Sequence, residues 1–279
     1  MNSTHSNFHI GFIGAGNMAG SLIRGLLAQG QPAQSIWATD VDAGKLETLA
    51  QDCGINNADA SQIAASVDVM VLAVKPQAMQ SVCESLATVL PGTAASPLVV
   101  SIAAGITIAH IEHYLGSNAA IVRCMPNMPA LIGKGASALF ANAQVTNAQK
   151  ALADKIMQAV GICVWVDREP DIDTVTAVSG SGPAYFFLFM EAMQDTAKSM
   201  GLSDKVARAL IYQTAVGAAE LALTSSESID ELRHRVTSPG GTTEAAIKQF
   251  ESGGIRELVD RALKAARDRS IKLADEIDN

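Results

Sequence analysis

A glycine-rich segment near the N-terminus has the residue types that bring a backbone close to phosphate. Residues 13–20 read IGAGNMAG, in which Gly14, Gly16 and Ala19 match the G-x-G-x-x-G/A pattern of dinucleotide-binding turns. Gly14 permits a tight turn, Gly16 lets a pyrophosphate approach the backbone, and Ala19 allows close packing of the helix that faces the anion. Such turns can also be purely structural, but the position between an apolar run and an amphipathic segment favours a nucleotide site.

An acidic residue follows at the distance that ribose recognition requires. Asp40 comes about 20 residues after the glycine pattern, where a carboxylate commonly accepts hydrogen bonds from the adenine ribose hydroxyls. A 2′-phosphate would meet like charge there, and the nearest downstream cation is Lys45. This pattern favours NADH over NADPH. The alternative is that Asp40 caps a helix or is a solvated loop charge.

Three further segments lie at the ends of apolar runs and contain residues that are suited to contact a ligand. Lys75 and Pro76 follow VMVLAV, and Ala103 lies in SIAAG, where small residues let a flat ring approach the backbone. The loop RCMPNMP contains two prolines that fix its backbone, and it presents Asn127 as a donor and acceptor. A cation kept in water is an equal interpretation of Lys75, and a rigid structural loop is an equal interpretation of RCMPNMP.

The last candidate is SPGGTT, residues 238–243, which leads into the helical pattern EAAIKQF. Pro239 and two glycines expose consecutive backbone N–H groups, and a helix N-terminus adds partial positive charge. This combination predicts a cradle for a carboxylate. An ordinary helix cap, with Thr242 or Gly241 as the N-cap residue, explains the segment equally well.

The elements that must position these residues alternate between strand and helix patterns in the first part of the chain. Short apolar runs predict strands at 8–13, 35–39, 67–74, 98–102, 119–123 and 162–166, and helical spacing predicts helices at 19–29, 43–52 and 77–90. The βαβα order favours a parallel, doubly wound sheet, so residues 1–167 are expected to form an α/β, Rossmann-type dinucleotide-binding domain.

After Asp167 only helical patterns are convincing, at 183–200, 203–223 and 254–277, with Ser203 as an N-cap candidate. Residues 168–279 are therefore expected to form an all-helical domain. YFFLFM, which begins at Tyr185, is apolar on every face, and helices of this kind must be buried. A domain of about 110 residues cannot easily enclose several of them, so we expect burial by a second copy of the chain.

Composition excludes several classes of protein. The 279 residues are 48% apolar and 17% charged, which rules out a disordered polyelectrolyte. A net charge of −8 makes nucleic acid an unfavourable partner. The four cysteines lie far apart without metal-ligand spacing, so neither a metal site nor a disulfide framework is expected, and a reducing cytoplasm fits best.

No targeting or membrane segment is expected either. The N-terminal tail lacks the charged and apolar regions of a secretory signal. The uncharged stretch 85–111 is interrupted by Pro91, Gly92 and Pro97, which argues for buried sheet rather than a membrane span.

Six blocks together resemble the pyrroline-5-carboxylate reductase family: IGFIGAGNMAGSLIRGL, AVKPQ, SIAAGI, RCMPNMPAL, SGSGPAY and SPGGTTEAAI stand in the family's order and approximate spacing. The resemblance covers nearly the whole chain. It implies reduction of 1-pyrroline-5-carboxylate to L-proline by hydride from NAD(P)H, the last step of proline synthesis. It also implies a dimer interlocked through the helical domain and often assembled further into a decamer.

The resemblance also assigns roles by position. The pyrophosphate-binding turn would comprise Gly14, Gly16, Asn17 and Met18, and the ribose and nicotinamide would be lined by Ala73, Val74, Lys75, Pro76 and Asn127. The substrate carboxylate cradle would comprise Ser238, Gly240, Gly241 and Thr242, and the Thr243 hydroxyl would bond the ring nitrogen. Ser179 and Ser181 would lie near the nicotinamide, or serve as plain N-caps of the following helix.

Two departures and two alternatives accompany this resemblance. Many relatives read approximately HPGELKD where this chain has SIDELRH at 228–234, and relatives that use NADPH commonly have Ser, Asn or Arg near Asp40. A β-hydroxyacid dehydrogenase would need a catalytic lysine in the helical domain, for which Lys198 and Lys205 are available. A non-catalytic NAD-sensing scaffold would keep the glycine pattern but have no use for SPGGTT.

Overall fold

The computed structural model describes residues 8–90, 96–116 and 119–277, so residues 1–7 of the predicted N-terminal tail, Pro91 and Gly92 lie outside the described residues. The described residues form an eight-stranded sheet in the order β3-β2-β1-β4-β5-β6-β7-β8. The strands are β1 (Ile10–Ile13), β2 (Ile36–Thr39), β3 (Asn56–Asn57), β4 (Val69–Leu72), β5 (Leu98–Ser101), β6 (Ile121–Met125), β7 (Gly135–Ala141) and β8 (Gly161–Trp165).

The length of the connection between two strands decides whether they pair in parallel or antiparallel. The pairs from β3 to β6 are parallel, as predicted, because helices or helix-containing segments return the chain across the sheet. The β6–β7 pair is antiparallel, and neither β7 nor the short edge strand β3 was predicted from the sequence. Only the short 3₁₀ turn η4 (Met128–Ile132) separates these two strands, and such a connection is too short for a parallel crossover. The predicted parallel sheet is therefore mixed.

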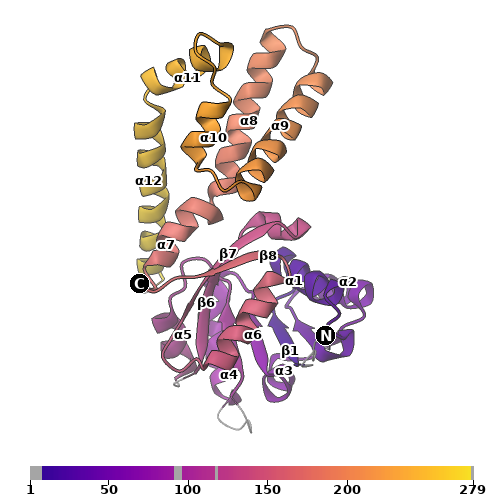
Figure 1. Ribbon diagram of the computed structural model, residues 1–279. Helices are drawn as coiled ribbons and strands as arrows, with labels where there is room; N and C mark the ends of the chain where they lie inside the picture. The colour runs from indigo at the N-terminus through magenta and orange to yellow at the C-terminus, as the bar shows by residue number, and fades with distance from the viewer. Residues whose placement is uncertain (1–7, 91–95, 117–118, 278–279) are drawn as a thin grey trace. The chain divides into compact units, whose positions relative to one another are not determined.

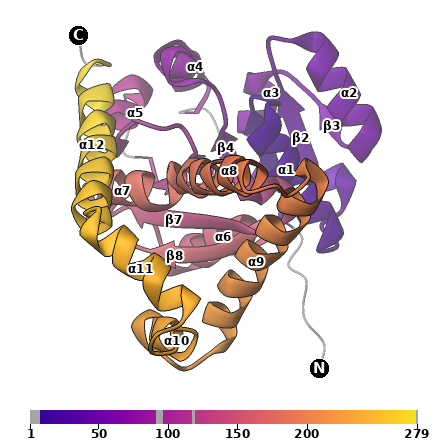
Figure 2. The same cartoon turned by 90° about the horizontal axis from the view of Figure 1, so that it is seen from above.

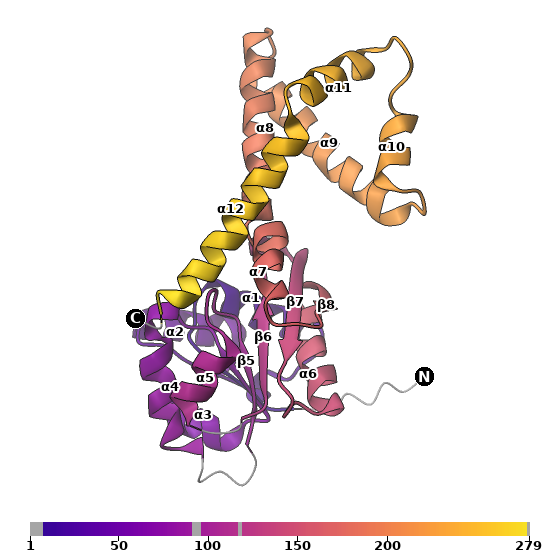
Figure 3. The same ribbon diagram turned by 90° about the vertical axis from the view of Figure 1, so that its left-hand side faces the viewer.

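Helices cover both faces of the sheet, as Figure 3 shows for α4 and α5 on one side and α6 on the other. One apolar core lies under α1, α2 and α6, with Phe12, Leu22 and Ile156 fully buried. The second lies under α3, α4 and α5, with Met70, Met79 and Ile111 fully buried. These helices are α1 (Asn17–Ala28), α2 (Ala43–Cys53), α3 (Ala60–Ser66), α4 (Met79–Ala87), α5 (Ile108–Leu115) and α6 (Asn147–Gln158).

Three of the helices, α3, α5 and α6, were not predicted, yet each begins with a recognisable local signal. Asp59, Thr107 and Thr146 accept a hydrogen bond from the N–H three residues later, and that third residue bonds back to the cap. This reciprocal capping box satisfies two N–H groups that a helix start leaves unpaired.

The chain divides into two compact units. The first contains the sheet, everything before Gly182, and the segment from Ala266 onward; the second is Gly182–Ala265. The helix α7 (Asp171–Val175) and the π-helical turn η5 (Thr176–Gly180) therefore pack with the sheet. The predicted functional boundary at 167/168 stays a prediction.

A buried ion network explains why these segments belong to the first unit. The Arg123 side chain on β6 is 3% exposed and lies 3.1 Å from Glu169 Oε1 and 3.5 Å from Asp173 Oδ1. Glu169 also accepts the Ile108 N–H, and Asp173 accepts the hydroxyl of Ser270. Burial strengthens these bonds and makes their loss costly, so α7 and the C-terminal part of α12 (Ile255–Asp275) are fastened to the sheet.

The second unit is all helical, as predicted, and Figures 1 and 2 label its helices in chain order. They are α8 (Gly182–Ser199), α9 (Asp204–Thr224), α10 (Ile229–Arg235), α11 (Thr242–Ser252) and the first half of α12 (Ile255–Asp275). Ser203 caps α9, as predicted. Phe189 of α8 packs against Phe250 of α11, with ring centroids 5.8 Å apart.

Much of the apolar surface of α8 remains exposed in one chain. Phe186, Phe187 and Leu188 are 67%, 53% and 66% exposed. Neighbouring large apolar side chains that are mostly exposed are unusual on soluble monomers and favour an interaction surface. Within the described residues, no helix combines the length and the hydropathy needed to cross a bilayer.

Candidate functional site

The glycine-rich turn connects β1 to α1 with a backbone that only glycine tolerates at its first position. Gly14 has φ +106°, and a Cβ there would lie 2.6 Å from the Ala73 carbonyl oxygen. Gly16, the N-cap of α1, has extended backbone, and a Cβ there would meet no atom within 4 Å. Gly14 therefore fixes the turn, and Gly16 leaves open space at a helix N-terminus with no side-chain cap. This space fits a pyrophosphate group.

Asp40 lies at the same edge of the sheet and holds the turn in place. Its carboxylate accepts the Ala15 N–H at 2.6 Å and the Asp42 N–H at 2.8 Å. The N-cap of α2 is Asp42, not Asp40, so the alternative role of Asp40 as a helix cap is not realised. Each Asp40 oxygen keeps a further lone pair for a hydroxyl donor.

A hollow of about 540 Å³ opens beside this turn, lined by Ala15, Gly16, Asn17, Gly20, Arg24, Gly44, Lys45, Thr48 and Leu49. Arg24 was not predicted, although it lies seven residues after Asn17, which places both on one face of α1. The Lys45 ammonium lies 3.0 Å from Asp42, which raises the pKa of Lys45 and lowers that of Asp42. Asp40, Asp42 and Lys45 together carry one negative charge, and Arg24 adds one further cation to the lining of the hollow.

The carboxyl ends of β4 and β5 bring the next predicted residues to the same edge. Ala73 N–H donates to the Ile13 carbonyl, so it extends the β1–β4 pairing beside the glycine turn. Lys75 is exposed, and its carbonyl accepts the Ala78 N–H at the start of the 3₁₀ turn η2 (Pro76–Ala78). Ala103 is 7% exposed and packs in the core, so only its backbone is suited to a ligand.

Asn127 follows β6 at this edge, but its side chain is engaged within the protein. Its Oδ1 accepts the Ala136 N–H at 2.9 Å, and its Nδ2 donates to the Ser179 carbonyl at 3.0 Å. The residue is 8% exposed. The loop therefore joins the start of β7 to η5, as the alternative of a rigid structural loop describes, and the cofactor-lining role of Asn127 stays a prediction.

Ser179 and Ser181 do not cap α8. Ser179 lies inside η5, where its hydroxyl donates to the Val175 carbonyl at 3.2 Å. Ser181 has helical backbone, and its N–H donates to the Thr176 carbonyl at 2.8 Å. The N-cap interpretation of both serines is wrong because the chain is already helical where they lie.

Residues 238–243 lie in the second unit and lead into α11, whose N-terminus has no side-chain cap. Gly240 has φ +71°, and Gly241 is the N-cap of α11, one of the two predicted candidates. The first-turn N–H groups of Thr242 and Thr243 are left without intrahelical partners. Thr243 is half-buried, and no described residue bonds its hydroxyl. These donors could hold a carboxylate and a ring nitrogen.

Glu244 is a neighbour of this cradle that the sequence analysis did not consider. Its carboxylate accepts the Gly240 N–H at 2.9 Å and lies 3.2 Å from the Lys248 ammonium. The backbone bond, and then Lys248, lower the pKa of Glu244. A glutamate in the first turn of a helix is favoured by the positive end of the helix dipole, and this signal could have identified it.

Other reactive groups do not form a competing centre. Burial raises the pKa of Cys83 and of Cys163 to about 12, so neither thiol is a nucleophile at neutral pH. Within 8–90, 96–116 and 119–277 no cluster of three or more His, Cys, Asp or Glu could hold a metal. Lys198 pairs with Asp195 at 2.9 Å, which raises its pKa and makes it unsuited to act as a base.

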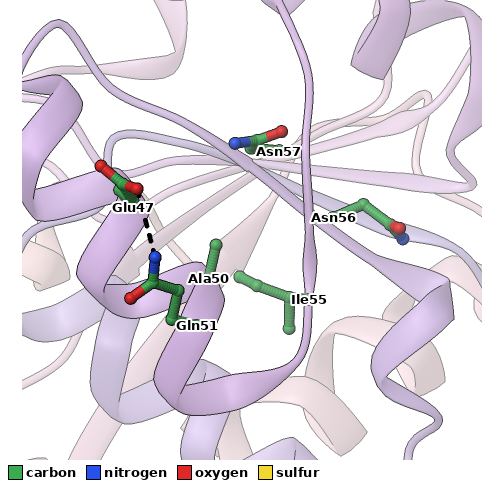
Figure 4. A pocket seen from close by; sticks show the side chains of 6 residues that line it. All are labelled: Glu47, Ala50, Gln51, Ile55, Asn56 and Asn57. Atoms are coloured by element: carbon green, nitrogen blue, oxygen red, sulfur yellow. Dashed lines mark hydrogen bonds between the residues drawn. The ribbon is translucent and has the colours of Figure 1, made fainter.

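A second hollow, of about 450 Å³, lies at the β3 edge of the sheet and is shown in Figure 4. It is lined by Glu47, Ala50, Gln51, Ile55, Asn56 and Asn57. The Gln51 amide donates to Glu47 one turn earlier on α2, and no predicted site residue lines this hollow. We assign it no role in the site.

Two family profiles match the chain. Residues 169–273 match "Pyrroline-5-carboxylate reductase dimerisation", and residues 9–105 match "NADP oxidoreductase coenzyme F420-dependent". A curated pyrroline-5-carboxylate reductase from Pseudomonas aeruginosa is 53% identical over 269 residues, which cover 96% of this chain and 97% of the relative.

Solved structures agree over the whole chain. A pyrroline-5-carboxylate reductase from Coxiella burnetii superposes with a TM-score of 0.92 at 46% identity, covering 96% of this chain and 99% of the other. The Plasmodium falciparum pyrroline carboxylate reductase, solved with NADP bound, has a TM-score of 0.82 at 29% identity, covering 96% and 98%.

Proposed function

Because the chain belongs to the pyrroline-5-carboxylate reductase family, we propose that the carboxyl edge of its sheet holds the nicotinamide cofactor and that residues 238–243 hold the imine substrate. The chain is an oxidoreductase that reduces the C=N bond of 1-pyrroline-5-carboxylate to give L-proline, the last step of proline biosynthesis. When bound, the reduced nicotinamide supplies the hydride. The protein's own contribution is to bind and orient the reactants.

The observation that carries the cofactor site is the open space at Gly16 beside the fixed turn at Gly14. The α1 N-terminus attracts the pyrophosphate there, with Asn17 and Met18 in the first turn. Ala73, Val74, Lys75 and Pro76 lie after β4, and the Ala103 backbone lies after β5, along the half of the edge suited to the nicotinamide and its ribose.

We further propose that NADH is preferred to NADPH. Asp40 is held by Ala15 and Asp42 N–H groups, so its charge stays at the ribose position. Lys45 is paired with Asp42 and does not reverse the sign of this turn. The Plasmodium falciparum relative was solved with NADP bound, which concerns that protein. For this chain, Asp40 is the residue on which the preference for NADH over NADPH depends.

In the substrate cradle we assign the carboxylate to the backbone N–H of Thr242 at the Gly240–Gly241 turn, with the Ser238 side chain beside it. The Gly240 and Gly241 N–H groups donate to Glu244 and to the Ser238 carbonyl in this structure, so they bind the substrate only after exchanging these partners. The α11 N-terminus favours the negative charge. Thr243 is the proposed catalytic residue, because its hydroxyl is without a described partner and is suited to hold the ring nitrogen as it becomes an amine. A ring imine can already carry a proton, so no strong buried acid is required.

The chain self-associates through the region that matches the dimerisation profile. We propose that the dimer is the minimal unit and that dimers assemble further into a decamer. The exposed apolar face of α8 supports the first step. A cytoplasmic setting, with no nucleic-acid or membrane partner, rests on the dispersed cysteines and the net charge of −8.

One assay tests the reaction. Oxidation of NADH is followed optically with pyrroline-5-carboxylate or with a 3-oxo acid as the oxidant. We expect turnover with the imine alone. Turnover with the 3-oxo acid would favour a β-hydroxyacid dehydrogenase, and NADH binding without turnover of either would favour a non-catalytic scaffold.

A further inference from the structure

The turn η5 is a break in regular helix at the end of the first unit. Its π-type bond joins the Ser181 N–H to the Thr176 carbonyl, five residues back, at 2.8 Å. The second unit begins at the next residue, Gly182. Single π turns inside helices are rare and occur often at functional sites, because the extra residue displaces the backbone that follows.

Two contacts hold η5 against the loop that follows β6. The Asn127 Nδ2 donates to the Ser179 carbonyl at 3.0 Å, across 52 residues of chain. The Met125 side chain fills the place of a side chain on residue 180, since a Cβ on Gly180 would lie 2.6 Å from Met125 Cε. The turn is therefore fastened to the strand end rather than merely adjacent to it.

Asn127 is suited to hold η5 in place, because its side chain donates one hydrogen bond and accepts another. Its Oδ1 accepts the Ala136 N–H at 2.9 Å, and its Nδ2 serves the Ser179 carbonyl. At 8% exposure, water does not substitute easily for either bond. A carboxylate can accept from Ala136 but cannot donate to Ser179.

We propose that Asn127 is a positioning residue for the reductase reaction: it sets the place of η5, and with it Ser179 and Ser181, at the carboxyl edge of the sheet. This inference rests on the proposed cofactor site at that edge. It differs from the role that resemblance gave Asn127, because the residue acts through the Ser179 carbonyl and need not touch the cofactor.

The test is Asn127→Asp, which keeps the size of the side chain and its acceptor but removes the donor. The introduced carboxylate faces the Ser179 carbonyl, so we expect kcat to fall about 5-fold to 150-fold. Because the glycine turn is untouched, NADH affinity, measured by titration of the folded variant, should change less than about threefold, which is under 0.7 kcal/mol.

Asn142 provides a matched control on the same sheet. Its Oδ1 accepts the Ile121 N–H at 3.1 Å, and its Nδ2 donates to the Ala119 carbonyl at 2.9 Å, at the start of β6 rather than its end. The amide also donates to Glu112. Asn142→Asp should therefore lower the melting temperature at least as much as Asn127→Asp, while kcat stays close to that of the wild type.

The pH dependence of kcat is a further test. It should not change in Asn127→Asp if Asn127 only stabilises the fold. In Asn127→Asp a protonated carboxyl regains a donor for Ser179, so kcat relative to the wild type should rise as the pH falls. The partners of the side chain are backbone groups, which do not titrate. The buried charges at this strand, Arg123 with Glu169 and Asp173, are present in both proteins.

Several outcomes would overturn the inference. They are a wild-type kcat in Asn127→Asp, an equal fall in both Asp variants, or a ratio to the wild type that does not change with pH. If Asn127→Asp does not fold, Asn127→Ala replaces it in the kcat comparison, with Asn142→Ala as its control. A separate variant tests the cofactor site on which this inference rests. Gly16→Val should abolish NADH binding, and NADH affinity equal to that of the wild type in this variant would show that the cofactor does not bind at the glycine turn.

Discussion

The carboxylate of Asp40 accepts the backbone N–H of Ala15 at 2.6 Å, which ties the end of β2 to the glycine-rich turn. In the proposed cofactor site, this bond keeps a negative charge at the position expected for a 2′-phosphate. We predict that Asp40→Ser raises the ratio of kcat/KM for NADPH to that for NADH by about 5-fold to 150-fold, as expected when a like charge worth ~1 to 3 kcal/mol is removed. Steady-state kinetics with both cofactors measure this ratio.

Asp42→Ser is the control for this prediction, because serine can still cap α2 while one negative charge is lost two residues away. Its effect on the cofactor ratio should be smaller. A wild-type protein with a several-fold higher kcat/KM for NADPH would show that Asp40 does not set the preference.

The second prediction concerns association. We expect no stable monomer at micromolar concentration, because Phe186 and Leu188 of α8 are 67% and 66% exposed in one chain. Light scattering should give a mass of at least twice the 29.0 kDa chain. Leu188→Asp should weaken association, whereas Val41→Asp, which changes an exposed apolar residue outside this helix, should not. A 29.0 kDa wild-type particle would contradict the prediction.

Thr243→Val tests the proposed catalytic hydroxyl. Valine keeps the shape of the side chain, and loss of one hydrogen bond to the reacting nitrogen costs about 1 to 3 kcal/mol, so turnover should fall roughly 5-fold to 150-fold. Thr242→Val should do less harm, because Thr242 is proposed to act through its backbone N–H. Wild-type turnover and substrate saturation in Thr243→Val would show that this hydroxyl has no part in the reaction.

Arg123→Met should destabilise the protein strongly. The change leaves Glu169 and Asp173 partly buried without their shared cation, which costs about 3 to 5 kcal/mol in comparable sites. Arg168→Met removes an exposed pair with Asp171 and should cost about 0 to 1 kcal/mol. Urea unfolding of both variants measures the difference, and equal midpoints would show that the buried network contributes little.

Thiol reactivity should be low. Burial raises the pKa of Cys83 and Cys163 to about 12 and that of Cys124 well above its ordinary value, so a thiolate fraction of about 10⁻⁴ is expected at pH 8 for the first two. Cys53 and Cys163 are both half-buried, and burial raises the pKa of each thiol. Because the pKa of Cys163 rises to about 12, Cys53 is the thiol best suited to react before unfolding. A chromogenic disulfide should therefore detect at most one thiol in the native protein and four after denaturation. Rapid release of more would contradict this burial.

Local signals predicted the elements that depend on neighbouring residues. The glycine turn and α1 follow from the types at Gly14, Gly16 and Ala19, and the α9 start follows from Ser203, because turns and caps are decided within a few residues. The strand β7 was not predicted at all, and neither was its antiparallel pairing, because the mostly small residues of GASALFA do not form a clear apolar run and a run does not reveal its partner strand.

Pairings over long distances depend on the fold instead. Ser270 bonds Asp173 across 97 residues, and Asn127 bonds Ser179 across 52. The sequence shows a serine and an asparagine with many possible partners, and composition does not choose among them. The choice is made when packing removes water from both groups, because a buried donor or acceptor must then find a partner within hydrogen-bond distance. Residue types and spacing thus indicated the chemistry of the site. Burial decided which side chains hold the segments around the site in place.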